Sequence, residues 1–277
     1  MTIDNEPARQ SPARGGRDVP QFLSIDGRVL HVAYRPGDRG PVVFANSLGT
    51  DLRIWDGVVD RLPDDIAVLR IDKRGHGLSA FGPVTISALA EDMAAAMDHF
   101  GLADAVACGV SVGGLIVQRL AIDRPDLVRA AVLSNTGLKI GNDEIWNERI
   151  TTVRARGLEP MADGILARWF GPSFHEGRAG ELEGYRAMLV RTPAEGYARV
   201  SEAIRDTDLT AEARLLTQPT ICIAGEGDQA TPVALVSALA DALPNAQLTT
   251  LPVVGHLPCI EAPGAVVRAL EELGLLA

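Results

Sequence analysis

The sequence has few cysteines and no long apolar stretch, and both absences limit what the protein can be. It contains three cysteines in 277 residues, Cys108, Cys222 and Cys259, and an odd count in a chain of this size gives no disulfide framework. Cys108 and Cys222 lie in apolar runs, so we expect buried free thiols and a reducing cytoplasm. No stretch approaches the roughly 20 apolar residues of a membrane span, and residues 1–20 lack the apolar segment of a signal peptide.

Positive charge is also scarce. The chain has 26 lysines and arginines against 36 acidic residues, a net charge of −10. Phosphate would be repelled, which argues against nucleic acid as a partner. The sequence shows no metal-ligand cluster, phosphate-binding loop or nucleotide fingerprint, so we predict no metal and no cofactor. A membrane partner is not expected either.

The order of apolar runs predicts an α/β fold. Asp26-Gly27 between two apolar runs is a strong hairpin signal. Beyond it, strands alternate with helix-like segments, which implies parallel pairing through right-handed crossovers. We therefore predict a mostly parallel eight-stranded sheet with helices on both faces. The predicted strands are residues 21–25, 28–34, 41–45, 67–71, 105–108, 128–133, 220–224 and 247–251.

The alternation stops between the sixth and seventh predicted strands. Residues 137–216 contain no convincing strand but carry four helix-like segments, at 143–156, 159–169, 181–191 and 194–205. We predict a helical cap over 137–216, inserted before the last strands. The α/β core then comprises residues 21–136 and 217–277. Residues 1–20, rich in proline, glycine and charge, are predicted to be a mobile N-terminal tail.

The pentapeptide GVSVG at residues 109–113 follows a predicted strand and precedes a helix-like segment. In that setting G-x-S-x-G forms a tight strand-to-helix turn that exposes the serine hydroxyl above the sheet. Glycine is needed because side chains there would collide with neighbouring backbone. We predict Ser111 as a nucleophile; the alternative is a glycine-rich turn that only connects two elements.

A serine hydroxyl is a weak nucleophile at neutral pH and needs a general base. His256 follows the last predicted strand, at the sheet edge where Ser111 is expected. His76 also follows a strand, but the glycine-rich turn DKRGHG at 72–77 favours a turn-stabilising cluster with Asp72 and Arg74. We predict His256 as the base, with His76 as its competitor.

A third group must orient the histidine and stabilise the imidazolium. Asp228 follows predicted strand 220–224, so its side chain is expected at the same sheet edge. The chain order serine, aspartate, histidine is one of the known orders of such triads. Asp228 is our predicted acid, and Glu226 is the nearby rival.

The reaction also needs two fixed N–H donors for the developing oxyanion. The backbone N–H of Val112, directly after the nucleophile, is the first. The loop NSLGT at 46–50 follows predicted strand 41–45, and we choose the N–H of Leu48 as the second. An ordinary turn is the alternative for this loop.

Taken together, the elbow, the loop NSLGTD (46–51), the turn DKRGHGLS (72–79) and the terminal pair Gly255-His256 resemble the α/β-hydrolase superfamily. More narrowly, the chain is similar to 3-oxoadipate enol-lactonases. The signs are the loop NSLGTDL in place of the commoner His-Gly loop, IWNERI at 145–150, LARWF at 166–170 and EAIRDTDL at 202–209. The resemblance covers residues 22–275.

This resemblance implies a cofactor-free serine hydrolase of the β-ketoadipate pathway, which opens a five-membered enol-lactone bearing an acetate side chain. The substrate carboxylate needs a donor that the triad does not supply, and arginine pairs with carboxylate bidentately. Arg149 and Arg168 are the candidates, beside Trp146 and Trp169. The alternative is that the arginines are surface charges and the tryptophans pack the cap.

Other functions stay open at this point. Lys73 stands where the family pattern has a small or polar residue, and Val112 replaces a common methionine. The chain could be another carboxylesterase or lactonase, or a carbon–carbon bond hydrolase, on the same scaffold. From a different class, it could be a catalytically silent small-molecule receptor. Aspartate-nucleophile dehalogenases are disfavoured because a serine occupies the elbow.

Overall fold

The computed structural model describes residues 18–275, which contain an eight-stranded sheet in the order β1-β2-β4-β3-β5-β6-β7-β8. β2 is antiparallel to β1 and β4, and the other neighbouring pairs are parallel. The predicted mostly parallel eight-stranded sheet is therefore confirmed. The strands are β1 (Val19–Ile25), β2 (Arg28–Arg35), β3 (Arg39–Ala45), β4 (Ile66–Ile71), β5 (Ala105–Val110), β6 (Val128–Ser134), β7 (Thr220–Gly225) and β8 (Ala246–Leu251).

The first two strands form the predicted hairpin. Asp26 and Gly27 both have positive φ, 49° and 76°, which is the backbone that a two-residue type I′ turn requires. β1 begins at Val19, so Val19 and Pro20 belong to a strand and not to the predicted tail. Residues 1–17 of that tail lie outside the described residues.

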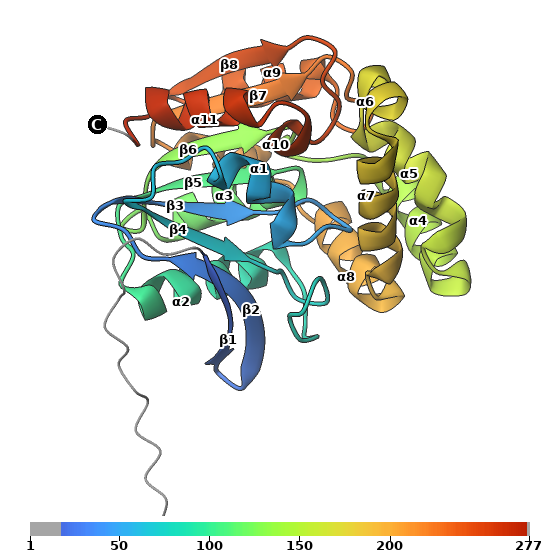
Figure 1. Cartoon of the computed structure of the whole chain (residues 1–277), viewed down its shortest axis with the longest axis horizontal. Coiled ribbons are helices and arrows are strands. Elements are labelled where there is room, and N and C mark those ends of the chain that lie inside the picture. The colour runs from blue at the N-terminus through green and yellow to red at the C-terminus, as the bar shows by residue number, and fades with distance from the viewer. Residues whose placement is uncertain (1–17, 276–277) are drawn as a thin grey trace, which may run out of the picture.

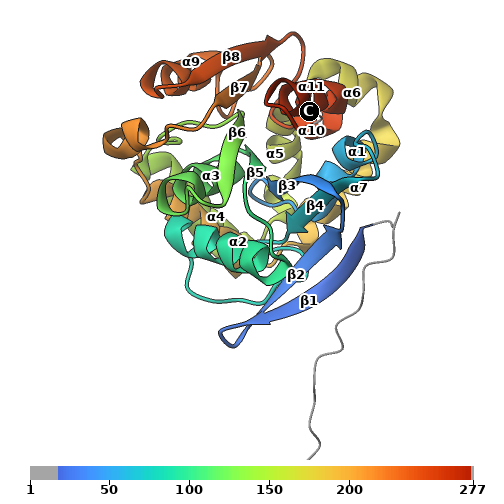
Figure 2. The ribbon, with the colours of Figure 1, turned by 90° about the vertical axis from the view of Figure 1, so that its left-hand side faces the viewer.

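The central strands are mostly apolar because both faces of the sheet are covered. Every residue of β4, β5 and β7 is buried, as expected for parallel strands between two helical layers. Figure 2 shows α2, α3 and α9 on one face and α1, α10 and α11 on the other. Their bounds are α1 (Asp56–Val59), α2 (Ile86–Phe100), α3 (Val112–Asp123), α9 (Val233–Ala242), α10 (Pro258–Glu261) and α11 (Pro263–Glu272).

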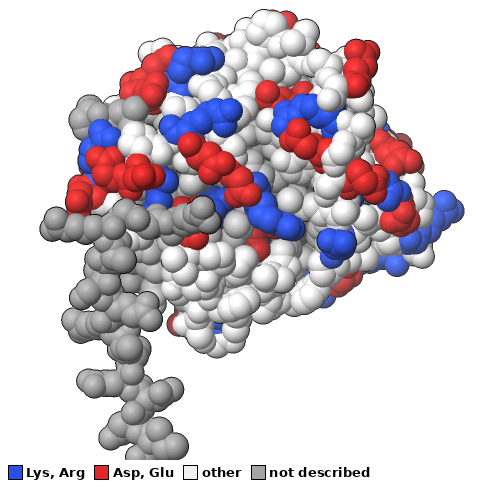
Figure 3. All heavy atoms as spheres, in the orientation of Figure 1, with Lys and Arg blue, Asp and Glu red and all other residues white. Residues whose placement is uncertain are grey.

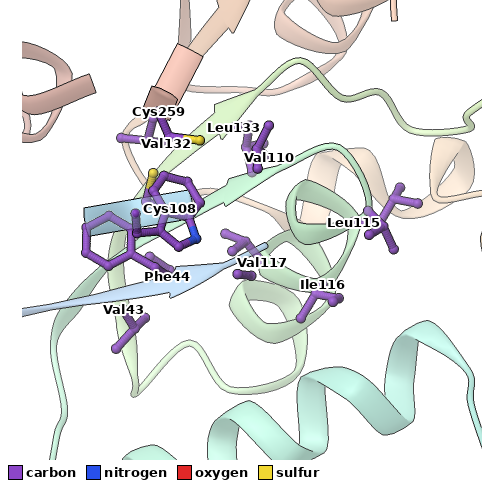
Figure 4. Packing of buried hydrophobic residues seen from close by; sticks show 14 of the residues in the cluster. Val43, Phe44, Cys108, Val110, Leu115, Ile116, Val117, Val132, Leu133 and Cys259 are labelled. Atoms are coloured by element: carbon purple, nitrogen blue, oxygen red, sulfur yellow. The ribbon is translucent and has the colours of Figure 1, made fainter. Parts of the chain in front are cut away.

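The hydrophobic core joins the central strands to the helix that follows Ser111 (Figure 4). The ring of Phe44 in β3 packs on Trp55, with centroids 4.7 Å apart. All three cysteines are free and buried, which confirms the prediction for Cys108 and Cys222. Burial raises the pKa of each thiol, to about 12 for Cys222.

Five α-helices lie between β6 and β7, on the flank of the sheet toward which β3, β4 and β8 point (Figure 1). We call them the inserted helices: α4 (Asp143–Arg156), α5 (Ala162–Trp169), α6 (Pro172–Gly177), α7 (Ala179–Arg191) and α8 (Ala194–Arg205). α4 packs on α8, and α5 and α6 pack on α7. The sequence analysis missed α6, whose six residues are too few to show an apolar period.

The described chain contains no helix long and apolar enough to cross a membrane. On the face shown in Figure 3, acidic and basic side chains are intermixed, so neither sign dominates that face. Many charged side chains of the described residues form ion pairs. Arg124, for example, bonds both Asp98 and Asp126.

Candidate active site

Ser111 lies on a sharp turn between β5 and α3. Its φ of 60° and ψ of −122° are unusual for a non-glycine residue, and such strained backbone is typical of functional sites. A Cβ on Gly109 would lie 2.2 Å from the carbonyl oxygen of Gly113, and one on Gly113 would lie 2.0 Å from that of Ala45. The predicted need for glycine at both positions is thus confirmed. Packing through these glycines fixes the height of the serine hydroxyl above the sheet.

A cavity of about 640 Å³ opens beside this turn, between the sheet edge and the inserted helices. Seven of the residues singled out by the sequence analysis line it, and they come from five separate parts of the chain. They are Leu48, Ser111, Trp146, Arg149, Arg168, Trp169 and His256. Ser47, Met161 and Tyr197 also contribute to its wall.

His256 and Asp228 form a buried pair behind the cavity. The Nδ1 atom of His256 lies 2.8 Å from Oδ2 of Asp228, and both side chains are almost completely shielded from solvent. With the Nδ1 proton directed at the carboxylate, Nε2 is left as the hydrogen-bond acceptor. The backbone N–H of His256 donates to the carbonyl of Trp169 at 2.9 Å, which holds the loop in place.

Four further hydrogen bonds hold the Asp228 carboxylate. The backbone N–H groups of Ala230 and Thr231 donate to Oδ1, while the Thr231 hydroxyl and the Asn135 amide donate to Oδ2. Burial alone would raise the pKa of Asp228, but His256 and the donated hydrogen bonds outweigh it and lower that pKa below its ordinary value. The carboxylate is therefore ionised at neutral pH and suited to stabilise a histidine cation.

The hydroxyl of Ser111 is not hydrogen-bonded to the histidine within the described residues. Ser111 and His256 line the same cavity, but within residues 18–275 no hydrogen bond joins the Ser111 hydroxyl to the imidazole. Catalytic hydrogen bonds of unliganded enzymes are often long and tighten when substrate binds. The structure thus contains the histidine–carboxylate half of the predicted triad, with the hydroxyl beside it in the cavity wall.

Two backbone N–H groups near Ser111 are the predicted donors to the oxyanion. Val112 is the first residue of α3, where N–H groups have no intrahelical acceptor. The N–H groups of Val112 and Leu48 have no hydrogen-bond partner in the described part of the chain. In the 46–50 loop, the neighbouring N–H groups of Gly49 and Thr50 are both occupied, by His76 and by the Ser47 carbonyl.

His76 does not face the cavity. Its side chain is fully buried, its Nε2 accepts the N–H of Gly49 at 3.1 Å, and its Nδ1 lies 3.3 Å from the Arg74 carbonyl. Burial and the nearby charge of Lys73 hold its pKa well below the usual value. His76 is thus a neutral histidine that orients the 46–50 loop. The predicted turn cluster is confirmed in part: His76 contacts the Arg74 carbonyl and Asp72 accepts the N–H of Leu78 in the same turn, but the imidazole that bonds the Asp72 carboxylate is His31 and not His76.

Lys73 holds the same loop from its other side. Its ammonium group donates to the carbonyls of Ser47 and Thr50, at 2.6 and 3.1 Å. These two residues lie on either side of Leu48-Gly49 in the sequence. Burial lowers the pKa of Lys73 to about 7, against the opposing effect of Asp72 and Asp51. A long cationic side chain therefore fits this turn because two backbone carbonyls need a buried donor.

This lowered pKa predicts a pH dependence of stability. Between pH 7 and 10.5 the unfolded chain keeps a proton on Lys73 that the folded chain has lost, so the free energy of unfolding should rise with pH. We expect Lys73→Met to lose about 2 kcal/mol of that rise between pH 7.5 and 9.5. Urea denaturation at both pH values measures it. Lys139→Met, at an exposed lysine, is the control, and equal slopes in wild type and Lys73→Met would contradict the prediction.

Two arginines of the cavity wall lack acidic partners. Within the described chain, neither Arg149 nor Arg168 lies within ion-pair distance of a carboxylate, although most other arginines do. The guanidinium of Arg149 stacks over the ring of Trp146, 5.1 Å from its centroid. Both arginines act on the pKa of buried Tyr197, which burial raises and their charges lower. Both arginines therefore line the cavity without an ion-pair partner among the described residues, and the carboxylate of Glu148 lines the same wall.

The sequence analysis missed three supporting groups. Asn135, directly after β6, bonds both Asp228 and the Gly255 carbonyl. The hydroxyl of Thr231 donates to Asp228. Glu261, which bonds the loop before His256, carried no signal, because the pattern E-A-P suggests only a helix start. Within residues 18–275 no group of three or more potential metal ligands occurs.

Several known proteins are similar to this chain in sequence and fold. A family model described as alpha/beta hydrolase fold matches residues 40–263. The 3-oxoadipate enol-lactonase 2 of Acinetobacter baylyi is 35% identical over 248 residues, 89% of this chain and 92% of that protein. Enol-lactonase 1 of the same organism is 32% identical over 75% of this chain and 79% of its own length. The crystal structure of the enol-lactonase from Burkholderia xenovorans LB400 superposes with a TM-score of 0.87 at 35% identity, covering 91% of this chain and 99% of that one.

Proposed function

The chain belongs to the α/β-hydrolase family, and from this we propose that it hydrolyses 3-oxoadipate enol-lactone to 3-oxoadipate with Ser111, His256 and Asp228 as its triad. The observation that carries the choice of substrate is the pair of arginines that form no ion pair within residues 18–275 and line the cavity that Ser111 and His256 share. A lactone with an acetate side chain has a carboxylate that these arginines could bind. The similarity to enol-lactonases supports the same assignment.

In the first half of the reaction, Nε2 of His256 takes the proton of the Ser111 hydroxyl as Oγ attacks the lactone carbonyl. The N–H groups of Leu48 and Val112 bind the resulting oxyanion. Asp228, held ionised by its hydrogen bonds, stabilises the imidazolium. The ring C–O bond then breaks, and His256 returns its proton to the departing enol oxygen.

The leaving group of a lactone stays attached to the acyl-enzyme and could close the ring again. An enol is a better leaving group than an ordinary alkoxide, and its conversion to the ketone removes the nucleophile that would re-close the ring. In the second half, His256 takes a proton from water, hydroxide attacks the acyl carbon, and Ser111 is released with its proton restored. The product is the 3-oxo dicarboxylate.

The assignment predicts a substrate preference that depends on the two arginines. Wild-type enzyme should turn over the enol-lactone, followed by loss of its ultraviolet absorbance, far better than p-nitrophenyl acetate. Arg149→Met combined with Arg168→Met should raise KM for the enol-lactone about ten- to a hundredfold, because a charged hydrogen bond contributes about 1.5–3 kcal/mol. Turnover of p-nitrophenyl acetate, which has no carboxylate, should change little.

Arg156→Met is the matched control, since Arg156 is an exposed arginine on the same helix as Arg149. A double variant with unchanged KM would contradict the proposed carboxylate contact. The volume of the cavity favours one second candidate, an ester or lactone larger than the enol-lactone, because about 300–1,000 Å³ is typical of pockets for drug-sized ligands. Efficient hydrolysis of such an ester, with none of the enol-lactone, would select that candidate.

A further inference from the structure

The carboxylate of Glu261 lies between the inserted helices and the loop that carries His256. Glu261 is the last residue of α10, and its Oε2 accepts the N–H of Gly171, just beyond α5, at 2.9 Å. Its other oxygen, Oε1, accepts the N–H of Gly255, immediately before His256, at 2.8 Å. One side chain therefore bridges two backbone segments that are far apart in the sequence.

The two segments are in direct contact on either side of this carboxylate. The N–H of His256 donates to the Trp169 carbonyl at 2.9 Å. A Cβ on Gly171 would lie 2.3 Å from the Val253 carbonyl oxygen, and one on Gly255 would lie 2.8 Å from that of Trp169. Glycine at both positions lets the backbones approach closely enough for Glu261 to reach both N–H groups.

Glu261 has no part in the proposed reaction, since it does not line the cavity. It is nevertheless partly buried, and this burial raises its pKa, while the two donated N–H groups and the charges of Arg178 and His175 lower it. Taking a carboxylate out of water is unfavourable unless its oxygens are hydrogen-bonded. Here each oxygen of the Glu261 carboxylate accepts one backbone N–H, and these two bonds offset the cost of its partial burial.

We propose that Glu261 is a positioning residue that fixes the imidazole of His256 relative to the cavity wall formed by Trp169. His256 is at one end of the bridge and Trp169 is two residues from the other end, and both side chains line the cavity. A substrate seated against Trp169 is thereby held at a set distance from Nε2. The inference depends on the proposed function only in taking His256 as the base.

Glu261→Gln tests this directly. The glutamine carbonyl can accept one N–H, but its NH₂ group would face the other donor, so one bond of the bridge is lost at constant size. We expect kcat for p-nitrophenyl acetate to fall about ten- to a hundredfold with little change in KM, because small misplacements of reacting groups have effects of this size. The far-downfield proton NMR signal of the His256 Nδ1–H should also shift or broaden.

Glu271→Gln, at an exposed glutamate of α11, removes the same charge and should match wild type in both readouts. Wild-type kcat together with an unchanged NMR signal in Glu261→Gln would overturn the proposal. If wild type hydrolyses neither substrate, the proposed function fails, while the NMR signal still reports on the bridge.

If Glu261→Gln does not fold, hydrogen exchange of the wild-type protein decides. The amides of Gly171 and Gly255 should then exchange slowly and at similar rates, because one carboxylate protects both. Fast exchange at either amide would overturn the proposal.

Discussion

Replacing Ser111 with alanine should lower kcat for the enol-lactone and for p-nitrophenyl acetate about 10⁴- to 10⁶-fold, while substrate still binds. The change removes only the hydroxyl, and the glycines that shape the turn remain. The oxyanion donors and the arginines stay in place, so the affinity for a carboxylate-bearing ligand should persist. Steady-state kinetics measure the first effect, and calorimetric titration with 3-oxoadipate measures the second.

The nucleophile can also be identified chemically. A phosphonate ester should label wild-type protein once, at Ser111, and mass spectrometry of the peptides locates the adduct. Ser47 is the other serine of the cavity wall, so it is the residue that could replace Ser111 in this role. Unchanged turnover in Ser111→Ala, or an adduct on Ser47, would defeat the assignment.

Asp228→Asn should lower kcat about 10³- to 10⁴-fold without unfolding the protein. The asparagine keeps the shape of the side chain, but it no longer fixes the Nδ1–H tautomer of His256 and cannot stabilise the imidazolium. Stopped-flow measurement of acylation by p-nitrophenyl acetate isolates the affected step. Glu226→Gln, at the exposed rival carboxylate, should leave kcat near the wild-type value. The reverse result would make Glu226 the acid.

Asp228→Asn should also change how the stability of the protein depends on pH in the acid range. The folded-state pKa of Asp228 is lowered, so the carboxylate stabilises the fold above its unfolded pKa of about 3.9 and loses that contribution as pH falls through the folded value. Above pH 5 the wild type should therefore be more stable than Asp228→Asn, and the difference should shrink at lower pH. Thermal denaturation between pH 3 and 7 follows it.

The supporting contacts around the site were beyond sequence reasoning for a physical reason. Lys73, His76 and Glu261 all bond backbone groups of segments far from them in the chain. Every residue type has these backbone groups, except that proline lacks the N–H, so the sequence does not show which of them such a side chain will contact. Asn135 likewise acts on a carboxylate that a whole helical insertion separates from it in sequence. Only the folded chain shows which backbone groups lack partners.

The sequence by itself determined the sheet, because buried parallel strands need continuous apolar runs and the intervening helices need an apolar face. It also determined the turn at Ser111, since two glycines there leave room that no other residue would. Parallel strands all end at one edge, so the sequence could also predict that Ser111, Asp228 and His256 meet there. The tertiary structure alone decided how closely they meet. His256 is hydrogen-bonded to Asp228, whereas no hydrogen bond within residues 18–275 joins the Ser111 hydroxyl to His256. Those last distances depend on packing between the inserted helices and the sheet, which is a sum of many weak contacts with no local pattern.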